Sequence, residues 1–134
     1  MDIERRLKIY FDGGCRPNPG QMETAVVLRG TTYLRPDCGR GSNNDAEWLA
    51  LIHAAEVALL IGARNVVMMG DSALVVLQAN GANKCRHPGL RIYRDTFLKL
   101  RSEFTSIAVR RISRSQNLAG IALTKMRWQI SQAL

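Results

Sequence analysis

Three carboxylates in this sequence stand where predicted strands and a predicted helix begin or end. Asp12 follows an alternating run of residues, Asp71 follows a short apolar run, and Glu47 falls in the first turn of a predicted helix. Because ligands of open α/β sheets bind at the carboxyl ends of strands, we expect these side chains to converge. Carboxylates packed together repel one another, and a divalent cation that prefers oxygen ligands, Mg²⁺ or Mn²⁺, compensates that repulsion. Two such ions about 4 Å apart activate water and stabilise the leaving oxygen in phosphodiester hydrolysis.

The stretch around Asp12 combines a strand with a turn. Leu7, Ile9 and Phe11 alternate with polar residues at the period of a strand. Gly13-Gly14 is expected to end that strand directly after the Asp. Glycines without Cβ let another backbone approach closely, and the prolines that follow restrict the returning loop, so the turn suits contact with a ligand's backbone. An ordinary hairpin loop with a solvent-facing Asp is the alternative.

The rest of the chain alternates between strand-like and helix-like segments. The predicted strands are Met22–Leu28, Thr31–Leu34, Asn65–Gly70 and Ile107–Ile112, and the predicted helices are Ala46–Leu60, Ser72–Gln78, Leu90–Glu103 and a last one from Asn117 onward. This order predicts an α/β fold with a mixed sheet, whose later strands run parallel to the first and whose faces carry helices. At 134 residues, we expect a single domain over residues 1–134.

The positive charge is concentrated in the second part of the sequence. The net charge is +8, and residues 81–134 hold eleven Lys and Arg against two acidic residues. Such a basic surface favours a nucleic acid as partner, with a generally basic solvated surface as the alternative. No apolar run approaches the length of a membrane helix, and the three scattered cysteines fit reduced thiols. We therefore expect a cytoplasmic protein with no membrane partner.

Several short motifs occur together in one order along the chain. They are Asp12-Gly13-Gly14 with Asn18-Pro19-Gly20, then Asn43-Asn44-Asp45-Ala46-Glu47 with Ala50-Leu51, and then Asp71-Ser72. In these motifs and their spacing the chain resembles type 1 ribonuclease H over nearly its whole length. The resemblance implies the ribonuclease H-like fold, a five-stranded mixed sheet of order 3-2-1-4-5 flanked by helices. It also implies an endonuclease that hydrolyses the RNA strand of RNA–DNA hybrids by two-metal-ion catalysis.

The resemblance also assigns roles by position. Asp12, Glu47 and Asp71 would be the catalytic and metal-binding residues, with two ions, Mg²⁺ or Mn²⁺, expected when substrate is bound. The residues expected to contact the nucleic acid are Gly13, then Cys15, Asn18, Asn43 and Asn44 at the minor groove of the hybrid, and Arg40 and Ser42 at a phosphate of the DNA strand. We expect a monomer that uses no small-molecule cofactor.

The chain departs from the family at a fourth position, on the last helix. The family carries an Asp four residues after an Asn there, whereas this chain has Ile121, or Gly120 if one residue is deleted. Neither residue binds metal, so the ion that holds the attacking water should bind more weakly, with a cost in turnover. Glu23 should lie too far along the second strand to replace the Asp, and Asn117 is a weak candidate.

Three functions are compatible with these observations. The first is a ribonuclease H enzyme, the second is a catalytically weak or inactive ribonuclease H-like module that binds hybrid or other nucleic acid, and the third is a nuclease of the same fold that acts on another nucleic acid. All three predict salt-dependent binding of hybrid. Residues that could contact substrate elsewhere are Lys84, Arg86, Arg91, Arg94, Arg110, Arg111, Arg114 and Trp48, the last of which could equally be a packing residue.

Overall fold

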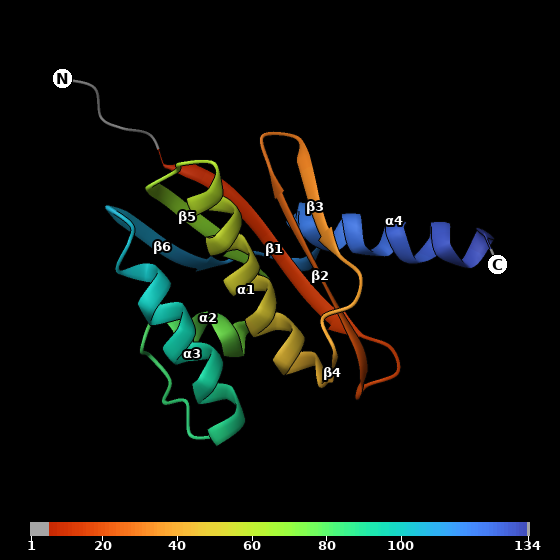
Figure 1. Cartoon of the computed structure of the whole chain (residues 1–134), viewed down its shortest axis with the longest axis horizontal. Helices are drawn as coiled ribbons and strands as arrows, with labels where there is room; N and C mark the ends of the chain where they lie inside the picture. The colour runs from red at the N-terminus through yellow and green to blue at the C-terminus, as the bar shows by residue number, and fades with distance from the viewer. Residues whose placement is uncertain (1–5, 134) are drawn as a thin grey trace.

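The computed structural model describes residues 6–133 and contains one mixed sheet with helices on both faces (Figure 1). The strands are β1 (Leu7–Cys15), β2 (Gly20–Leu28), β3 (Thr31–Arg35), β4 (Arg40–Gly41), β5 (Asn65–Gly70) and β6 (Ser106–Arg111). The helices are α1 (Asn43–Leu60), α2 (Ala73–Ala79), α3 (Pro88–Arg101) and α4 (Leu118–Ala133), with a 3-10 turn, η1, at Arg114–Gln116. Residues 1–5 and 134 of the predicted domain lie outside the described part.

The strand order is β3-β2-β1-β5-β6, with β4 paired to β2 alone. β1 is antiparallel to β2 and parallel to β5, and β5 is parallel to β6. The predicted α/β fold class and the order 3-2-1-4-5 are therefore confirmed for the five longer strands. The two-residue strand β4 is an addition that its Gly-rich, Pro-containing surroundings did not indicate. Among residues 6–133, no helix combines the length and hydropathy needed to cross a bilayer.

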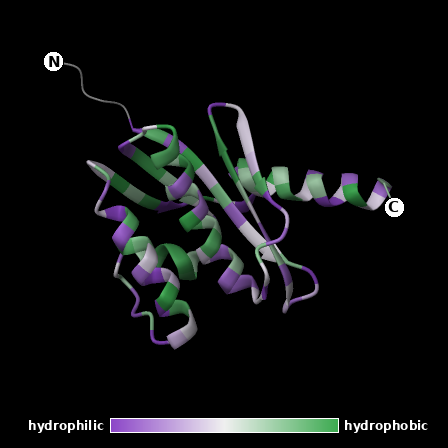
Figure 2. Ribbon diagram, viewed as in Figure 1, coloured by the Kyte–Doolittle hydropathy of each residue, from purple (hydrophilic) through white to green (hydrophobic). Residues whose placement is uncertain are grey.

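The two faces of the sheet carry different helices. Figure 1 shows α1, α2 and α3 on one face and α4 on the other. Val26 and Leu28 of β2 pack in the large core under α1, whereas Ala25 and Val27 pack with Leu123 of α4. This alternation is the period of two that a strand buried on both faces requires. Figure 2 shows that α1 is hydrophobic over most of its length and polar near its N-terminal end, as its central position demands.

The N-terminus of α1 is fixed by a capping box. The Ser42 hydroxyl accepts a hydrogen bond from the Asp45 N–H, and the Asp45 carboxylate accepts one from the Ser42 N–H. The helix begins at Asn43, three residues before the predicted start, because its cap is Ser42, the first residue of the polar run 42–45. Glu47 consequently lies in the second turn of α1, not in the first turn as predicted.

Trp48 is a core residue of α1. Its side chain is fully buried, its indole N–H donates to Gln78 Oε1 at 3.0 Å, and its ring centroid lies 6.2 Å from that of Phe97. A buried indole needs such a polar partner, and the tilted ring pair adds to the packing. Of the two roles considered for Trp48, the structure therefore assigns packing and excludes stacking on a substrate.

The prediction that β1 ends at Gly13-Gly14 is wrong. β1 continues to Cys15, and Gly13 and Gly14 pair with Thr24 and Glu23 of β2. The glycine is needed for a different reason: a Cβ on Gly13 would lie 2.1 Å from the carbonyl oxygen of Ala46. Only glycine lets α1 approach β1 this closely, so Gly13 marks a contact between strand and helix instead of a turn.

Replacing Gly13 by Ala should destabilise the protein, because the new methyl group meets rigid helix backbone. We expect a loss of about 1–3 kcal/mol in the free energy of unfolding, measured by urea denaturation. Gly14→Ala is the matched control, since a Cβ there meets only the end of the Arg127 side chain, at 2.8 Å, which can move aside. Equal losses in the two variants would contradict this account of the contact.

Candidate active site

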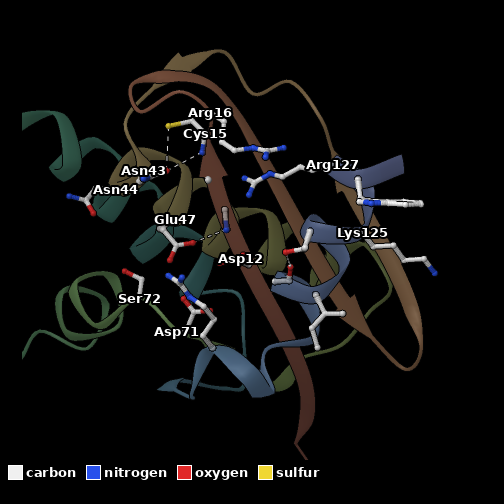
Figure 3. Close-up of a pocket in the computed structure, with 17 residues that line it drawn as sticks. Asp12, Cys15, Arg16, Asn43, Asn44, Glu47, Asp71, Ser72, Lys125 and Arg127 are labelled. Atoms are coloured by element: carbon white, nitrogen blue, oxygen red, sulfur yellow. Dashed lines mark hydrogen bonds between the residues drawn. The ribbon is translucent and has the colours of Figure 1, made fainter. Parts of the chain in front are cut away.

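A cleft of about 940 Å³ opens where β1, β5 and the N-terminal part of α1 meet α4 (Figure 3). One wall is formed by residues that follow Asp12 in β1 and by the start of α1, and the other wall by α4. The lining residues that carry side-chain polar groups or charge are Asp12, Cys15, Arg16, Asn43, Asn44, Glu47, Asp71, Ser72, Arg114, Thr124, Lys125, Arg127 and Trp128. The floor is acidic and much of the rim is basic or amide-bearing.

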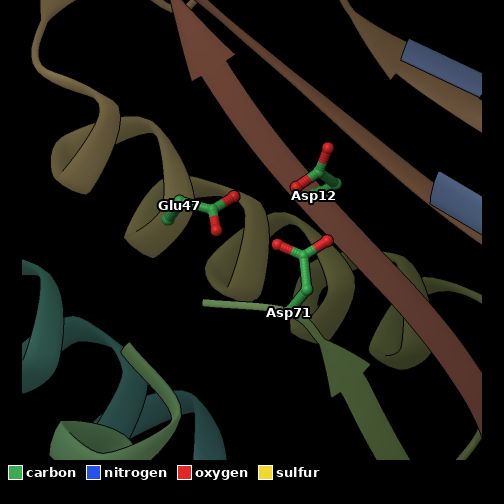
Figure 4. Close-up of side chains that lie close together, drawn as sticks. All are labelled: Asp12, Glu47 and Asp71. Atoms are coloured by element: carbon green, nitrogen blue, oxygen red, sulfur yellow. The ribbon is translucent and has the colours of Figure 1, made fainter. Parts of the chain in front are cut away.

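Asp12, Glu47 and Asp71 converge on the floor of this cleft (Figure 4). Each offers one carboxylate oxygen, and these three oxygens all lie within 4.8 Å of one another. Asp12 and Asp71 meet because β1 and β5 are adjacent and parallel, and Glu47 joins them because α1 approaches β1 at Gly13. The expected convergence of the three side chains is therefore present in the structure.

Hydrogen bonds hold two of the carboxylates in place. The Gly13 N–H donates to Glu47 Oε1 at 2.7 Å. The buried Asn117 amide donates to Asp71 Oδ2 and to the Phe11 carbonyl, each at 3.0 Å. Its own oxygen accepts from the Ala119 N–H at 3.1 Å, at the start of α4. Asn117 therefore positions Asp71 instead of acting as a substitute metal ligand.

Burial and mutual repulsion make this cluster retain protons. Burial raises the pKa of Asp12 from 3.8 to about 6, and the Asp71 charge adds to the rise while a hydrogen bond from Glu47 opposes it. Burial, followed by the Asp12 charge, raises the pKa of Glu47 from 4.5 to about 9. The two groups titrate as a pair, so without a cation the cluster holds at least one proton at neutral pH.

The donor set fits a hard divalent cation. Three carboxylate oxygens close together, on the floor of a cleft with room for water, match the ligands that Mg²⁺ and Mn²⁺ take in proteins. A cation would replace the protons that the raised pKa values retain, and it would remove the repulsion among the carboxylates.

The two residues expected at the fourth position, Gly120 and Ile121, carry no group that binds metal. A Cβ on Gly120 would lie 3.2 Å from Asp12 Oδ2, so the backbone of α4 itself approaches this carboxylate. Ile121 lines the same cleft and is 54% exposed. Glu23 of β2 pairs with Gly14 of β1, and its carboxylate forms an ion pair with Arg127 instead of joining the floor. No carboxylate from α4 reaches the floor in the part of the chain that the structure describes.

Three residues expected at the minor groove form one hydrogen-bonded cluster beside the carboxylates. Asn43 Oδ1 accepts from the Cys15 N–H at 3.1 Å, and Asn18 Oδ1 accepts from the Asn43 N–H at 3.1 Å. The Cys15 thiol is buried among Asn18, Asn43 and the Gly41 carbonyl, so it shapes the loop. Asn43 and Asn44 line the cleft, as do Gly13 and Cys15, whereas Asn18 is exposed and does not line it.

The two residues expected at a DNA phosphate lie outside this cleft lining. Ser42 donates its hydroxyl to Asp45 Oδ2 at 2.8 Å and serves as the cap of α1. Arg40 is exposed on β4, where it pairs with Gln21 of β2, and its guanidinium is not engaged by any hydrogen bond found among the described residues. Of this pair, Arg40 is the one free to contact a ligand.

Only some of the basic residues suggested for substrate contact lie at the cleft. Lys84, Arg86, Arg91 and Arg94 do not line the cleft, and Arg91 donates to the carbonyls of Cys85 and Arg86, which fixes that loop. Arg114 lines the cleft, and Arg111 donates weakly to the Asp71 carbonyl at 3.5 Å.

The sequence interpretation missed the contribution of α4. Gly120, Thr124 and Arg127 all line the cleft, and they recur at the i, i+4, i+7 spacing of one helix face. The spacing is present in the sequence, but it does not by itself show which face of the helix meets the carboxylates.

Removing the Glu47 charge should stabilise the metal-free protein at alkaline pH. A raised folded-state pKa stabilises the fold below the unfolded pKa, and this stabilisation is lost as the pH rises through about 9. His53, whose pKa burial lowers to about 4, has its effect at more acidic pH and does not interfere. In EDTA, between about pH 7 and pH 9, Tm should fall in the wild type and stay flatter in Glu47→Gln, which should melt at least about 3 °C higher at the upper end. A wild-type Tm that does not fall over this range would contradict the assignment.

Known proteins resemble this chain in sequence. A family model described as reverse transcriptase-like matches residues 10–127. The chain is 36% identical over 123 residues to a ribonuclease HI of Halobacterium salinarum, and 33% identical over 118 residues to the bifunctional protein Rv2228c of Mycobacterium tuberculosis. These matches cover 88% and 84% of this chain but 62% and 32% of those proteins, so the chain spans less than two thirds of either relative.

Solved structures agree with this placement. The crystal structure of RNase H1 from Halobacterium salinarum matches with a TM-score of 0.82 and 34% identity, over 89% of this chain and 94% of that one. LC11-RNase H1 in complex with RNA/DNA hybrid matches with a TM-score of 0.78 and 30% identity, over 88% of this chain and 93% of that one. With the three carboxylates in one cleft and these similarities in sequence and structure, the chain belongs to the reverse transcriptase-like family and, within it, to the type 1 ribonucleases H.

Proposed function

We propose that this chain is a Mg²⁺- or Mn²⁺-dependent endonuclease that hydrolyses the RNA strand of RNA–DNA hybrids. The observation that carries the proposal is the convergence of Asp12, Glu47 and Asp71 in a cleft with a partly basic rim. It gains support from family membership, since LC11-RNase H1, a relative by structure, was crystallised with an RNA/DNA hybrid.

The three carboxylates would hold the metal ions. When bound, two ions would supply an activated water and stabilise the leaving oxygen, leaving 3′-hydroxyl and 5′-phosphate ends. Gly13 and Asn117 keep Glu47 and Asp71 in position for this task. Because the Glu47 carboxyl has a raised pKa, binding of the ions releases protons, and metal affinity should increase with pH.

The walls of the cleft would select the substrate. The Asn43 and Asn44 amides, which line the cleft, would meet the minor-groove 2′-hydroxyls that distinguish RNA from DNA. Hydrogen bonds with Cys15 and Asn18 support the position of Asn43. Arg40, exposed on β4, would bind a phosphate of the DNA strand, because a guanidinium fork matches phosphate oxygens.

A catalytically weak or inactive module that binds hybrid is the second candidate function. The specific observation in its favour is that Gly120 and Ile121 stand where the family has a fourth carboxylate. Three carboxylates neutralise less of the positive charge of the ions than four, so the ions should bind more weakly than in a site of four carboxylates.

Cleavage of a labelled RNA–DNA hybrid in Mg²⁺, and separately in Mn²⁺, tests the enzyme against the binding module. We expect product in the wild type and background levels in Asp12→Asn, because that change removes a ligand charge without altering side-chain size. Asp95→Asn, an equal change at an exposed site on α3, serves as the control and should cleave normally. Hybrid binding without cleavage by the wild type would favour the inactive module.

Restoring a carboxylate on α4 should strengthen the site. In Ile121→Asp, metal affinity measured by calorimetry, or the cleavage rate, should rise by roughly 10-fold or more. Ile130→Asp adds the same charge on the same helix outside the cleft lining and should change neither quantity. An unchanged affinity and rate in Ile121→Asp would count against placing the fourth site at this residue.

A further inference from the structure

The wall of the cleft formed by α4 carries two cations and an exposed aromatic ring that none of the roles described above includes. Lys125, Arg127 and Trp128, which we call the α4 rim, line the cleft on its α4 side. Figure 3 shows the Arg127 side chain directed toward β1, whereas Lys125 extends outward. None of the three was assigned a role by the motifs around the carboxylates. A cleft wall that carries both cations and an exposed aromatic ring is suited to a nucleic-acid strand, since cations bind phosphates and an aromatic ring stacks on a base or sugar.

Arg127 is held directly beside the carboxylate floor. Its guanidinium Nη2 lies 2.8 Å from the point where a Cβ on Gly14 would stand, and Gly14 is the next residue after Asp12 on the same face of β1. Its Nε donates to Glu23 in a mostly buried ion pair, with side-chain exposures of 23% and 15%. The Arg127 charge also acts on Asp12, whose pKa it lowers against the larger effect of burial.

The helical spacing explains how Arg127 reaches this place. Arg127 follows Gly120 by seven residues, which is two turns or about 10 Å along the axis, so both residues project from the same side of α4. Gly120 faces Asp12 and Arg127 faces Gly14, so one face of α4 meets β1 at both of these positions.

Trp128 lies next to this cation and is not part of the core. It is 63% exposed although it lines the cleft, whereas Trp48, the other tryptophan of the chain, is fully buried. The buried residues of α4 are Ala119, Leu123 and Met126, which already cover the sheet. A large exposed ring at the rim of a charged cleft therefore has no packing role to explain it.

We infer that the α4 rim is a substrate-binding surface, in which Arg127 contacts a phosphate beside the carboxylates and Trp128 stacks against the neighbouring base or sugar. This inference rests on the proposed function and deepens it, since the nucleic acid is the hybrid whose RNA strand enters the cleft. Glu23 holds the Arg127 side chain over β1 before substrate arrives, which reduces the entropy lost when the phosphate is bound.

The competing account is that the pair of Arg127 and Glu23 only ties α4 to β2. A structural tie predicts that Arg127→Gln and Glu23→Gln lower stability alike and leave hybrid affinity unchanged. A phosphate contact predicts that only Arg127→Gln weakens binding, because Glu23→Gln keeps the cation and removes a competing negative charge.

Hybrid binding should be measured with the full chain carrying Asp12→Asn, so that no cleavage occurs, by fluorescence anisotropy of a labelled RNA–DNA hybrid over a range of salt concentrations. Adding Arg127→Gln should weaken binding and reduce the slope of log affinity against log salt by about one. Adding Trp128→Ala should weaken binding by roughly 5-fold or more at every salt concentration, with the slope unchanged.

Matched controls separate these effects from general ones. Arg29→Gln removes a cation at the turn between β2 and β3, remote from the cleft, and Ile130→Ala removes an exposed apolar side chain of α4 outside it. Neither should change affinity or slope. Acrylamide quenching gives a second measurement, because hybrid should protect the exposed Trp128 in the parent, while Trp128→Ala leaves only the buried Trp48 and should show no change on binding.

The outcomes distinguish this inference from the proposed function. If the parent binds hybrid and both α4 rim variants bind it equally well with unchanged slope and no protection of Trp128, the inference is overturned and the proposed function stands. If the parent binds no hybrid at all, the proposed function fails and the inference fails with it. Weaker binding in both variants, with a changed slope only in Arg127→Gln, supports it.

Discussion

The close approach of α1 to β1 at Gly13 is the contact on which the rest of the site depends. With no Cβ between them, the Ala46 carbonyl lies against the strand, and the next residue of the helix, Glu47, is delivered to the strand's Asp12. The same contact lets the Gly13 N–H bind the Glu47 carboxylate. A larger residue would move the whole helix, and with it both the cap at Ser42 and the amides at the mouth of the cleft.

The electrostatic consequence of that contact is a cluster under internal repulsion. Asp12 and Glu47 are brought together in a partly desolvated place, where the pKa of each rises and protons are retained in the absence of a cation. Arg127 stands near enough to oppose this repulsion in part. A divalent cation would therefore stabilise the site, since its charge replaces the repulsion among the carboxylates with attraction to the ion.

Much of this arrangement could be predicted from the sequence, because short patterns carry it. The apolar run at Asn65–Gly70 gave the buried strand with its correct bounds, and Asp12, Glu47 and Asp71 were recognisable from their local motifs. The end of β1 was misplaced because Gly13-Gly14 has the composition of a turn, whereas its function depends on the distant Ala46. The roles of Arg127 and Trp128 depend on where α4 crosses the sheet, and no local pattern specifies that crossing.

The hydrogen bonds of Asn117 have a consequence for the order in which the protein acquires its site during synthesis. This one amide joins Phe11 and Asp71, and the contact with Phe11 spans 106 residues of chain. A nascent chain that has released β1, α1 and β5 from the ribosome still lacks the group that orients Asp71. The carboxylate site is therefore completed only after Asn117 has left the ribosome and reached β1 and β5.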